Sequence, residues 1–145
     1  MEYSKIDKLG VNPSLLGFGC MRFPKKEDGT IDEVEAERML DHAIESGVTY
    51  IDTAYPYHDG ESEPFVGRVL KKYKRKDYYL ATKLPMFKID SLQQAKDIFE
   101  EQMKRLDVDY VDFYLLHALN KDTWKKVLDL NIIPYCEELK KQGKN

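Results

Sequence analysis

The stretch YIDTAYPYHDGESE, residues 50–63, indicates how this chain folds. Its first residues and the preceding Val48 form an apolar run typical of a buried strand, and Asp52 follows where that strand should end. Tyr57 comes five residues later, in a loop made of Pro, His, Asp and Gly. A carboxylate at the end of a buried strand needs partners, because an unpaired buried charge is costly. We expect those partners at the ends of neighbouring strands.

Strand-like runs recur along the chain at a nearly constant spacing. They are LLGFGCM (15–21), VTYIDT (48–53), YYLATKL (78–84) and YVDFYLLH (110–117), and their starts lie 33, 30 and 32 residues apart. Helical periodicity predicts helices from Ile31 to Ser46, from Ser62, from Asp90 and, after a short turn around 124–130, from about Pro134. This alternation is typical of βαβ units with parallel strands.

Two features of the N-terminal part give finer expectations. Residues 3–11, YSKIDKLGV, look like a short hairpin before the first unit. In the first helix, Thr30 and Glu33 form a capping-box pattern. Val34 and Leu40 are expected to be buried, and Gly47 is well placed to end that helix.

The composition is that of a globular protein with one domain, over residues 1–145. Apolar residues make up 42% and charged residues 34%. A net charge of −3 and a pI near 5.7 give no electrostatic reason to expect nucleic acid or an anionic membrane as a partner. The one basic run, KKYKRK (71–76), closes the second predicted helix, where cations suit the helix dipole.

The two cysteines, Cys20 and Cys136, stand far apart without CxxC or Cys/His spacing. This argues against a disulfide framework and against a zinc site, so no metal is expected. No apolar run approaches the roughly 20 residues of a membrane span. The N-terminus lacks the charged-then-apolar order of a signal peptide, and we expect a cytoplasmic location.

Polar side chains mark the ends of three successive strands: Asp52, Lys83 and His117. Barrel enzymes collect catalytic groups from the ends of several strands, whereas an open doubly wound sheet uses a glycine-rich turn after its first strand. The first strand here continues as GFGCMRFP (17–24), which lacks GxGxxG and leads into a polar loop. We therefore predict an α/β fold of the (β/α)8 barrel type. A full barrel needs roughly 250 residues, so this chain holds about half: the N-terminal hairpin and four βα units.

The side chains at the C-terminal ends of these strands, the mouth of the predicted barrel, suit the reduction of a carbonyl group. Asp52 and Lys83 come from adjacent strands, so their charged ends can pair. A lysine beside Tyr57 would favour the phenolate and make proton donation easier. His117 could donate a hydrogen bond to a carbonyl oxygen. None of these side chains can give a hydride, so a nicotinamide cofactor must supply it.

Each of these residues also has a simpler interpretation. A tyrosine after a strand usually packs, a lysine at a strand end is usually solvated, and a histidine there often caps the backbone. The equivalent positions of Asp52, Lys83 and His117 in three successive units favour a shared site. Cys20 could line the mouth, but a buried structural thiol is the favoured interpretation. His58 is expected to be a solvated loop residue.

At these positions the sequence resembles the aldo-keto reductase family of (β/α)8 barrels. The matching segments are LGVNPSLLGFGCMRFP (9–24), IDTAYPYHDGESE (51–63), LATK (80–83) and DYVDFYLLH (109–117). The resemblance implies that Tyr57 is the proton donor, assisted by Lys83, Asp52 and His117. It implies NADPH, less often NADH, as the cofactor. The cofactor-binding residues expected from it are Cys20, Met21, Arg22 and Asp52, near the nicotinamide end.

The resemblance is nearest to the bacterial branch in which an iron–sulfur segment follows the barrel, on the basis of GFGCMRFP and LLHALN (115–120). It also implies that most cofactor-binding loops lie in the second half of the barrel. A four-stranded half-barrel would leave two strand edges and an apolar inner face open. Such edges allow a homodimer or a complementing half-barrel.

The sequence is compatible with three functions. The first is an NAD(P)H-dependent oxidoreductase that reduces a small aldehyde or ketone to an alcohol, either by itself or only when the missing half-barrel is supplied. The second is a catalytically inactive half-barrel that self-associates or binds a partner. The third, an open flavodoxin-like domain that binds a mononucleotide, leaves Lys83 and His117 unexplained.

Overall fold

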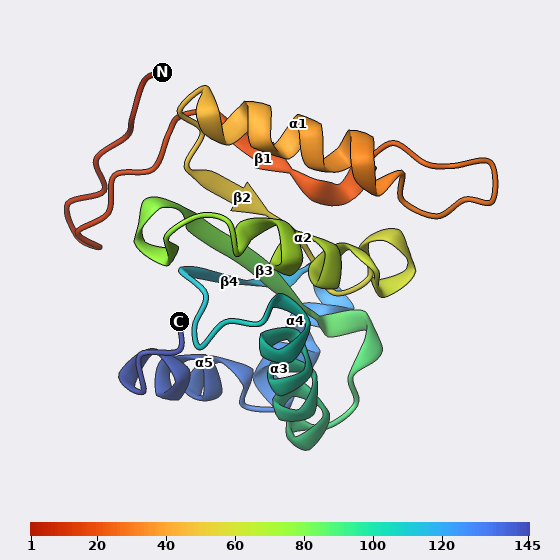
Figure 1. The fold of residues 1–145 in the computed structure, drawn as a ribbon. Coiled ribbons are helices and arrows are strands. Elements are labelled where there is room, and N and C mark those ends of the chain that lie inside the picture. Colours follow the sequence, from red (N-terminus) through yellow and green to blue (C-terminus); the bar gives the residue numbers. More distant parts are fainter.

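The computed structural model describes the whole chain, residues 1–145, and contains one sheet of four parallel strands. The strands are β1 (Gly17–Gly19), β2 (Tyr50–Asp52), β3 (Tyr79–Pro85) and β4 (Phe113–His117). They lie side by side in the order β1-β2-β3-β4, which is also their order in the sequence (Figure 1). A doubly wound sheet has a different order, because later strands add on both sides of the first. The flavodoxin-like arrangement is therefore excluded, and the fold is a section of a (β/α)8 barrel.

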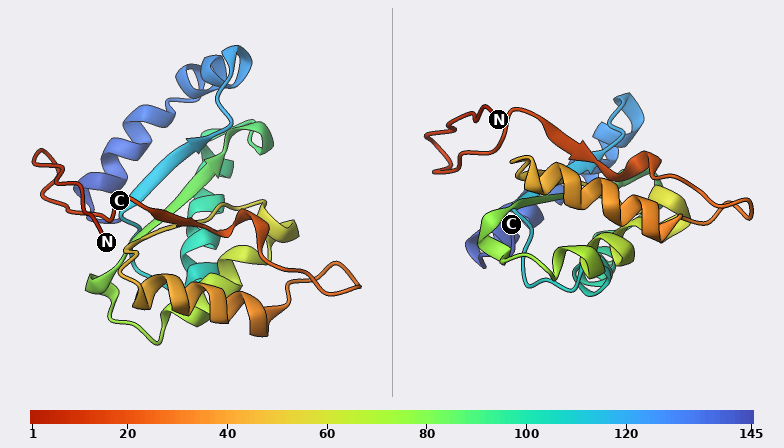
Figure 2. Two further views of the ribbon diagram at one scale, coloured as in Figure 1. Left: turned by 90° about the horizontal axis from the view of Figure 1, so that it is seen from above. Right: turned by 45° about the horizontal axis from the view of Figure 1, so that its top comes forward.

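Helices cover the outer face of this section. They are α1 (Glu33–Glu45), α2 (Ser62–Leu70), α3 (Leu92–Leu106), α4 (Lys121–Asp129) and α5 (Ile132–Lys141). The first three lie on one face of the twisted sheet, and α4 and α5 follow at its β4 edge (Figures 1 and 2). Each of the first three helices joins one parallel strand to the next, as the predicted βαβ units require.

Alternate residues of the strands point to opposite faces, and only one face is packed. On the outer face, Ile51 and Leu80 are fully buried in a core cluster with side chains of α1, α2 and α3. Leu84 belongs to a second cluster with residues of α3, α4 and α5. Burial of one such side chain stabilises the fold by about 1.5–3 kcal/mol.

The inner face of the sheet is more open. The rings of Tyr50 and Phe113 lie 5.2 Å apart between their centroids, and Leu115 keeps 38% of its surface exposed. These residues share a face with Asp52 and His117, because residues two apart on a strand point the same way. The inner face therefore carries an apolar patch beside the predicted site.

The first helix begins later than its capping-box pattern predicted. The side chain of Asp32, not of Thr30, caps it by accepting the Glu35 N–H at 3.2 Å. Thr30 lies in a tight loop closed by a bridge between residues 25 and 31, and its hydroxyl donates to Asp28 instead. The expected burial of Val34 is also wrong, since Val34 is 83% exposed.

The segment after β4 departs furthest from the prediction. The expected short turn around 124–130 is wrong, because residues 121–129 form α4. Asn120 accepts the Thr123 N–H at 2.9 Å, and the Thr123 hydroxyl accepts the Asn120 N–H at 2.7 Å, which completes a capping box. Val127 is fully buried and holds this helix on the core. The following helix begins at Ile132, two residues before the expected start at Pro134.

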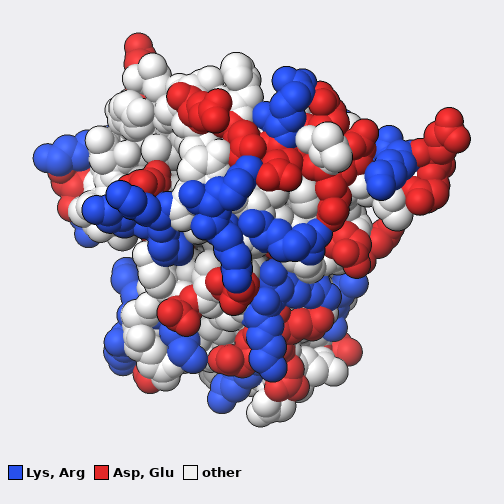
Figure 3. Space-filling view, viewed as in Figure 1, with Lys and Arg blue, Asp and Glu red and all other residues white.

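The predicted N-terminal hairpin is confirmed by antiparallel bridges between Ile6 and Val11 and between Tyr3 and Ser14. The helical surface carries charges of both signs in close alternation (Figure 3). Within the basic run 71–76, for example, Lys72 pairs with Glu37 and with Asp41, each at 2.6 Å. None of the helices combines the length and the apolar composition that a membrane span requires.

Candidate active site

Lys83 and Asp52 form an ion pair at the C-terminal end of the sheet. The register pairs Asp52 with Ala81, so Lys83 lies two residues further along the same face of the adjacent strand. Its Nζ donates to Asp52 Oδ1 at 2.7 Å and to the Thr53 carbonyl at 2.8 Å. The side chains of Lys83 and Asp52 are 13% and 27% exposed, so each charge has a partner where water is scarce.

Tyr57 stands at the start of a short 3-10 segment, Tyr57–Gly60, that follows β2. Lys83 Nζ donates to its hydroxyl oxygen at 3.4 Å and lies 5.0 Å from the centre of its ring. A cation at this position stabilises a negative charge on the phenolic oxygen. The arrangement therefore suits a tyrosine that gives a proton away.

His117, the last residue of β4, completes the group. Its ring meets those of Tyr57 and Phe87 edge to face, at centroid distances of 5.9 and 5.5 Å. Burial and the nearby Lys83 cation lower the pKa of His117, and the Asp52 carboxylate opposes them. The imidazole is thus neutral at pH 7 and keeps one N–H donor. All four residues predicted as catalytic come together at one end of the sheet.

The turn after β1, Cys20–Arg22, behaves differently at each residue. The Cys20 side chain is fully buried in the core, and burial, reinforced by Asp52, raises the pKa of its thiol. The structural-thiol interpretation is therefore correct, and a cofactor contact through this side chain is not available. Met21 is 55% exposed and Arg22 is also exposed, so these two can reach a ligand.

The backbone of Gly19 is open beside the site. Gly19 pairs with Asp52 across the sheet, and open space lies where a Cβ of Gly19 would be. Met21 and Arg22 follow two and three residues after Gly19, in the exposed turn after β1. No group of three histidine, cysteine or acidic side chains has the arrangement of a metal site.

His58 is not the solvated loop residue that the sequence suggested. Its Nε2 accepts the backbone N–H of Phe23 at 3.1 Å, and its ring lies 5.6 Å from that of Phe23. The residue adopts a left-handed backbone conformation, with φ of 52°. His58 thereby ties the turn that starts at Tyr57 to the segment after β1.

Acid is expected to destabilise the fold by protonating His58 and breaking its hydrogen bond with the Phe23 N–H. Burial and the Lys25 cation lower the pKa of His58 below its ordinary value of 6.5, with Asp59 acting in the opposite direction. The unfolded chain then binds a proton at a higher pH than the folded chain, so the free energy of unfolding decreases as pH falls below about 6.5. Protonation also converts Nε2 from an acceptor into a donor and removes the bond to Phe23.

Urea unfolding of the wild type and of His58→Gln, at about pH 7.5 and pH 5.5, measures this effect. The loss of stability between the two pH values should be smaller in the variant. His42→Gln is the matched control, because His42 lies exposed on α1 and its removal should leave the pH dependence unchanged. An equal acid effect in wild type and His58→Gln would contradict the assignment.

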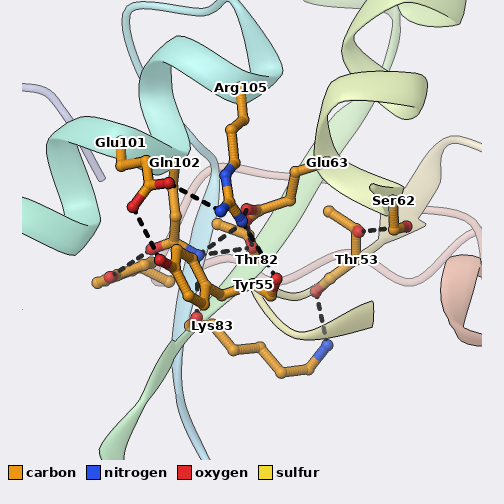
Figure 4. A network of polar contacts seen from close by, with 10 residues as sticks. Thr53, Tyr55, Ser62, Glu63, Thr82, Lys83, Glu101, Gln102 and Arg105 are labelled. Carbon is orange, nitrogen blue, oxygen red and sulfur yellow. Dashed lines mark hydrogen bonds and ion pairs between the residues drawn. The ribbon is translucent and has the colours of Figure 1, made fainter. Parts of the chain in front are cut away.

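A buried polar network lies directly behind the site and was missed in the sequence (Figure 4). Glu63, Thr82 and Gln102 are buried, and they bond to one another and to Arg105. One signal could have found it: Gln102 lies on the apolar stripe of α3, between Phe99 and Leu106. A polar residue on a buried helix face needs partners.

Comparison with known proteins gives a consistent result. The family model described as "Aldo/keto reductase family" matches residues 15–144. The aldo-keto reductase YhdN of Bacillus subtilis is 34% identical over 125 residues, which cover 81% of this chain and 38% of that protein. L-Galactose dehydrogenase of Arabidopsis thaliana is 29% identical over 99% of this chain and 46% of its own length.

Solved structures agree with the sequence matches. The holo form of the aldo-keto reductase AKR11C1 from Bacillus halodurans superposes with a TM-score of 0.79 and 34% identity, over 99% of this chain and 47% of that one. The thermostable aldo-keto reductase Tm1743 gives a TM-score of 0.79 and 29% identity, over 99% and 51%. The chain thus spans half or less of the curated relatives it matches, and its likeness to the iron–sulfur branch stays a prediction. With the family model covering nearly its whole length, this chain belongs to the aldo/keto reductase family.

Proposed function

We propose that this chain provides the proton donor for the reduction of an aldehyde or ketone by NADPH, or less often NADH. The observation that carries the proposal is the position of Lys83, whose ammonium bonds to Asp52, to the Thr53 carbonyl and to the Tyr57 hydroxyl. One cation placed between a carboxylate and a phenol is the arrangement that assisted proton donation requires.

The chain's own residues have separate roles in this proposal. The substrate carbonyl oxygen accepts hydrogen bonds from the Tyr57 hydroxyl and from neutral His117. A bound nicotinamide would supply the hydride to the carbonyl carbon. As the carbonyl oxygen gains negative charge, Tyr57 gives it a proton, and Lys83 stabilises the phenolate that remains. Asp52 compensates the charge of Lys83 and keeps its Nζ pointed at the hydroxyl.

The cofactor proposal has two supports. Gly19, which pairs with Asp52, has open space at its Cβ position, so a ligand could approach the backbone there. An aldo-keto reductase from Klebsiella pneumoniae, which shares this fold with a TM-score of 0.66, was solved in complex with NADPH. We propose that Asp52, Met21 and Arg22 hold the reacting end and that the barrel region outside this chain holds the rest.

Turnover is best tested with the barrel completed. The chain is mixed with the C-terminal half of YhdN or AKR11C1, and NADPH oxidation is followed with a panel of aldehydes and ketones. The proposal expects turnover in the mixture and little in either half alone. A mixture that forms a stable complex and binds NADPH, yet reduces nothing, would contradict the proposed function.

Lys83→Met is expected to lower the turnover rate by about 100-fold or more, because the loss of assisted proton transfer costs rates of this order. Methionine keeps an unbranched side chain only one atom shorter but removes the cation that contacts Tyr57. Lys72→Met is the matched control, since Lys72 forms its ion pairs on the outer surface, and it should keep near-normal turnover. Steady-state rates of both variants decide between a catalytic and a merely structural lysine.

A second candidate is a half-barrel that associates through its open surfaces. In this chain β1 and β4 each pair with one strand only, and the inner face exposes Leu115 next to Tyr50 and Phe113. Unpaired strand edges and an apolar face favour association with another half-barrel. Sedimentation equilibrium tests this: a dimer that Leu115→Glu converts to monomer supports it, and a stable wild-type monomer contradicts it.

A further inference from the structure

A buried carboxylate lies at the centre of the network behind the site. Glu63, in the first turn of α2, has none of its surface exposed. Its Oε1 accepts from the Thr82 hydroxyl at 2.6 Å and from the Gln102 amide at 2.8 Å, and its Oε2 accepts from Arg105 Nη1 at 3.4 Å. Burial raises the pKa of Glu63, while these donors lower it. The carboxylate is thereby supported on both of its oxygens.

Gln102 connects this carboxylate to the backbone of Lys83. Its Nε2 donates to the Lys83 carbonyl at 3.0 Å, and its Oε1 accepts from the Tyr114 hydroxyl at 2.7 Å, which fixes the orientation of the amide. Two residues before Lys83, the Ala81 carbonyl accepts the N–H of Thr53, which directly follows β2. The strand β2 does not extend far enough to offer the Lys83 carbonyl a similar backbone partner. The side chain of Gln102 therefore takes the place of the missing strand partner.

Arg105, one turn further along α3, supports the loop that carries Tyr57. Its Nη1 donates to the Tyr55 carbonyl at 3.3 Å, and its Nη2 donates to Glu101 at 2.8 Å. The guanidinium lies 4.2 Å from the centre of the Tyr55 ring, whose hydroxyl also bonds to Glu101. At the other end of the loop, a Cβ on Gly60 would stand 3.5 Å from Nη1. Figure 4 shows Arg105 directed from α3 toward Glu63 and Tyr55.

We propose that Arg105 is a positioning residue, which acts with Gln102 and Glu63 to set the distance between Lys83 and the Tyr57 hydroxyl. Gln102 holds the strand that bears Lys83, Arg105 holds the loop that bears Tyr57, and both bond to the same carboxylate. The 3.4 Å contact between Lys83 and Tyr57 spans these two supported segments. None of these three side chains is proposed to contact the substrate. That this distance affects catalysis rests on the proposed function, in which Lys83 assists proton donation by Tyr57.

The test replaces Arg105 with lysine, which keeps the positive charge near Glu63. A single ammonium cannot reproduce the planar fork that bonds the Tyr55 carbonyl, Glu63 and Glu101 together. Arg105→Lys should therefore preserve the fold but loosen the loop. Arg75→Lys is the matched control, because Arg75 also bonds two backbone carbonyls and a carboxylate and stacks on Tyr110 at 3.9 Å. It precedes the opposite, N-terminal end of β3.

The readout is an NMR double-mutant cycle that needs neither cofactor nor turnover. The 13Cε resonance of Lys83, assigned by its loss in Lys83→Arg, is recorded with and without Tyr57→Phe in each background. Removing the Tyr57 hydroxyl should shift this resonance by the same amount in wild type and in the control variant Arg75→Lys. In Arg105→Lys the shift should fall by half or more.

An unchanged shift in folded Arg105→Lys would overturn the proposal. If that variant does not fold, Glu63→Gln combined with Arg105→Met removes the cation and the buried carboxylate together and is measured in the same way. Failure of both variants to fold would also overturn it, because the role would then be general stability. If the completed barrel shows no turnover, the proposed function is contradicted. The result of the NMR double-mutant cycle does not depend on that outcome.

Discussion

Tyr57→Phe is expected to reduce carbonyl turnover by about 100- to 10,000-fold, the range that a positioned proton donor contributes. Phenylalanine keeps the ring and its edge-to-face contact with His117, so the shape of the site is preserved. Only the hydroxyl is lost, and with it the proton for the carbonyl oxygen and the 3.4 Å contact with Lys83. The measurement is the steady-state rate of NADPH oxidation by the completed barrel.

The effect should lie in kcat, because the hydroxyl acts mainly when charge develops on the carbonyl oxygen. Tyr73→Phe is the matched control. The Tyr73 hydroxyl bonds to Asp41 at 2.6 Å and joins the segment after α2 to α1, away from the site, so its loss should leave turnover within a few fold of wild type. Full turnover in Tyr57→Phe would assign proton donation to another group and overturn the mechanism.

Gly67→Ala is expected to destabilise the fold by about 3 kcal/mol, at the upper end of the cost of overpacking a core. Gly67 lies in α2, where alanine is ordinarily the better helix former by about 1 kcal/mol. Here a Cβ would stand 2.6 Å from the Leu106 carbonyl oxygen and 2.9 Å from the Arg105 carbonyl oxygen. Both contacts are with backbone, so α2 and the end of α3 would have to move apart.

Urea unfolding of Gly67→Ala and of Gly19→Ala checks this expectation. Gly19 has a negative φ of −90° and open space at its Cβ position, so its replacement should change the free energy of unfolding by less than about 0.5 kcal/mol. Because Gly67 packs against Arg105, its replacement should also loosen the support of Tyr57. A Gly67→Ala chain as stable as wild type would show that the two helices are not held at this distance.

The strand ends could be predicted because their signal is local. Asp52, Lys83 and His117 each follow an apolar run, and parallel strands bring such ends to one edge whatever the details of packing. The missed helix α4 had a local signal too, the Asn120 and Thr123 capping box, but its short apolar stripe made it look like a turn. The first helix was misjudged because Thr30 satisfies its hydroxyl within a preceding tight loop.

Other features have no local signal, since they depend on which elements meet. The tight fit of Gly67 follows from the approach of α2 to α3, and nothing in the residues around it specifies that distance. His58 reads as a loop residue until Phe23, 35 positions earlier, is brought to its ring. The same is true of Gln102, which joins Glu63, 39 positions away, to the backbone of Lys83.

The order of the βα units, the barrel type of sheet and the identity of the four side chains at its C-terminal end could all be predicted from the residues alone. These depend on hydrophobic period and strand ends, which are properties of short segments. The distance between Lys83 and Tyr57, and the buried groups that maintain it, became visible only in the folded chain. Hydrogen bonds between segments far apart in the chain require their elements to be packed first, and packing is a property of the whole fold.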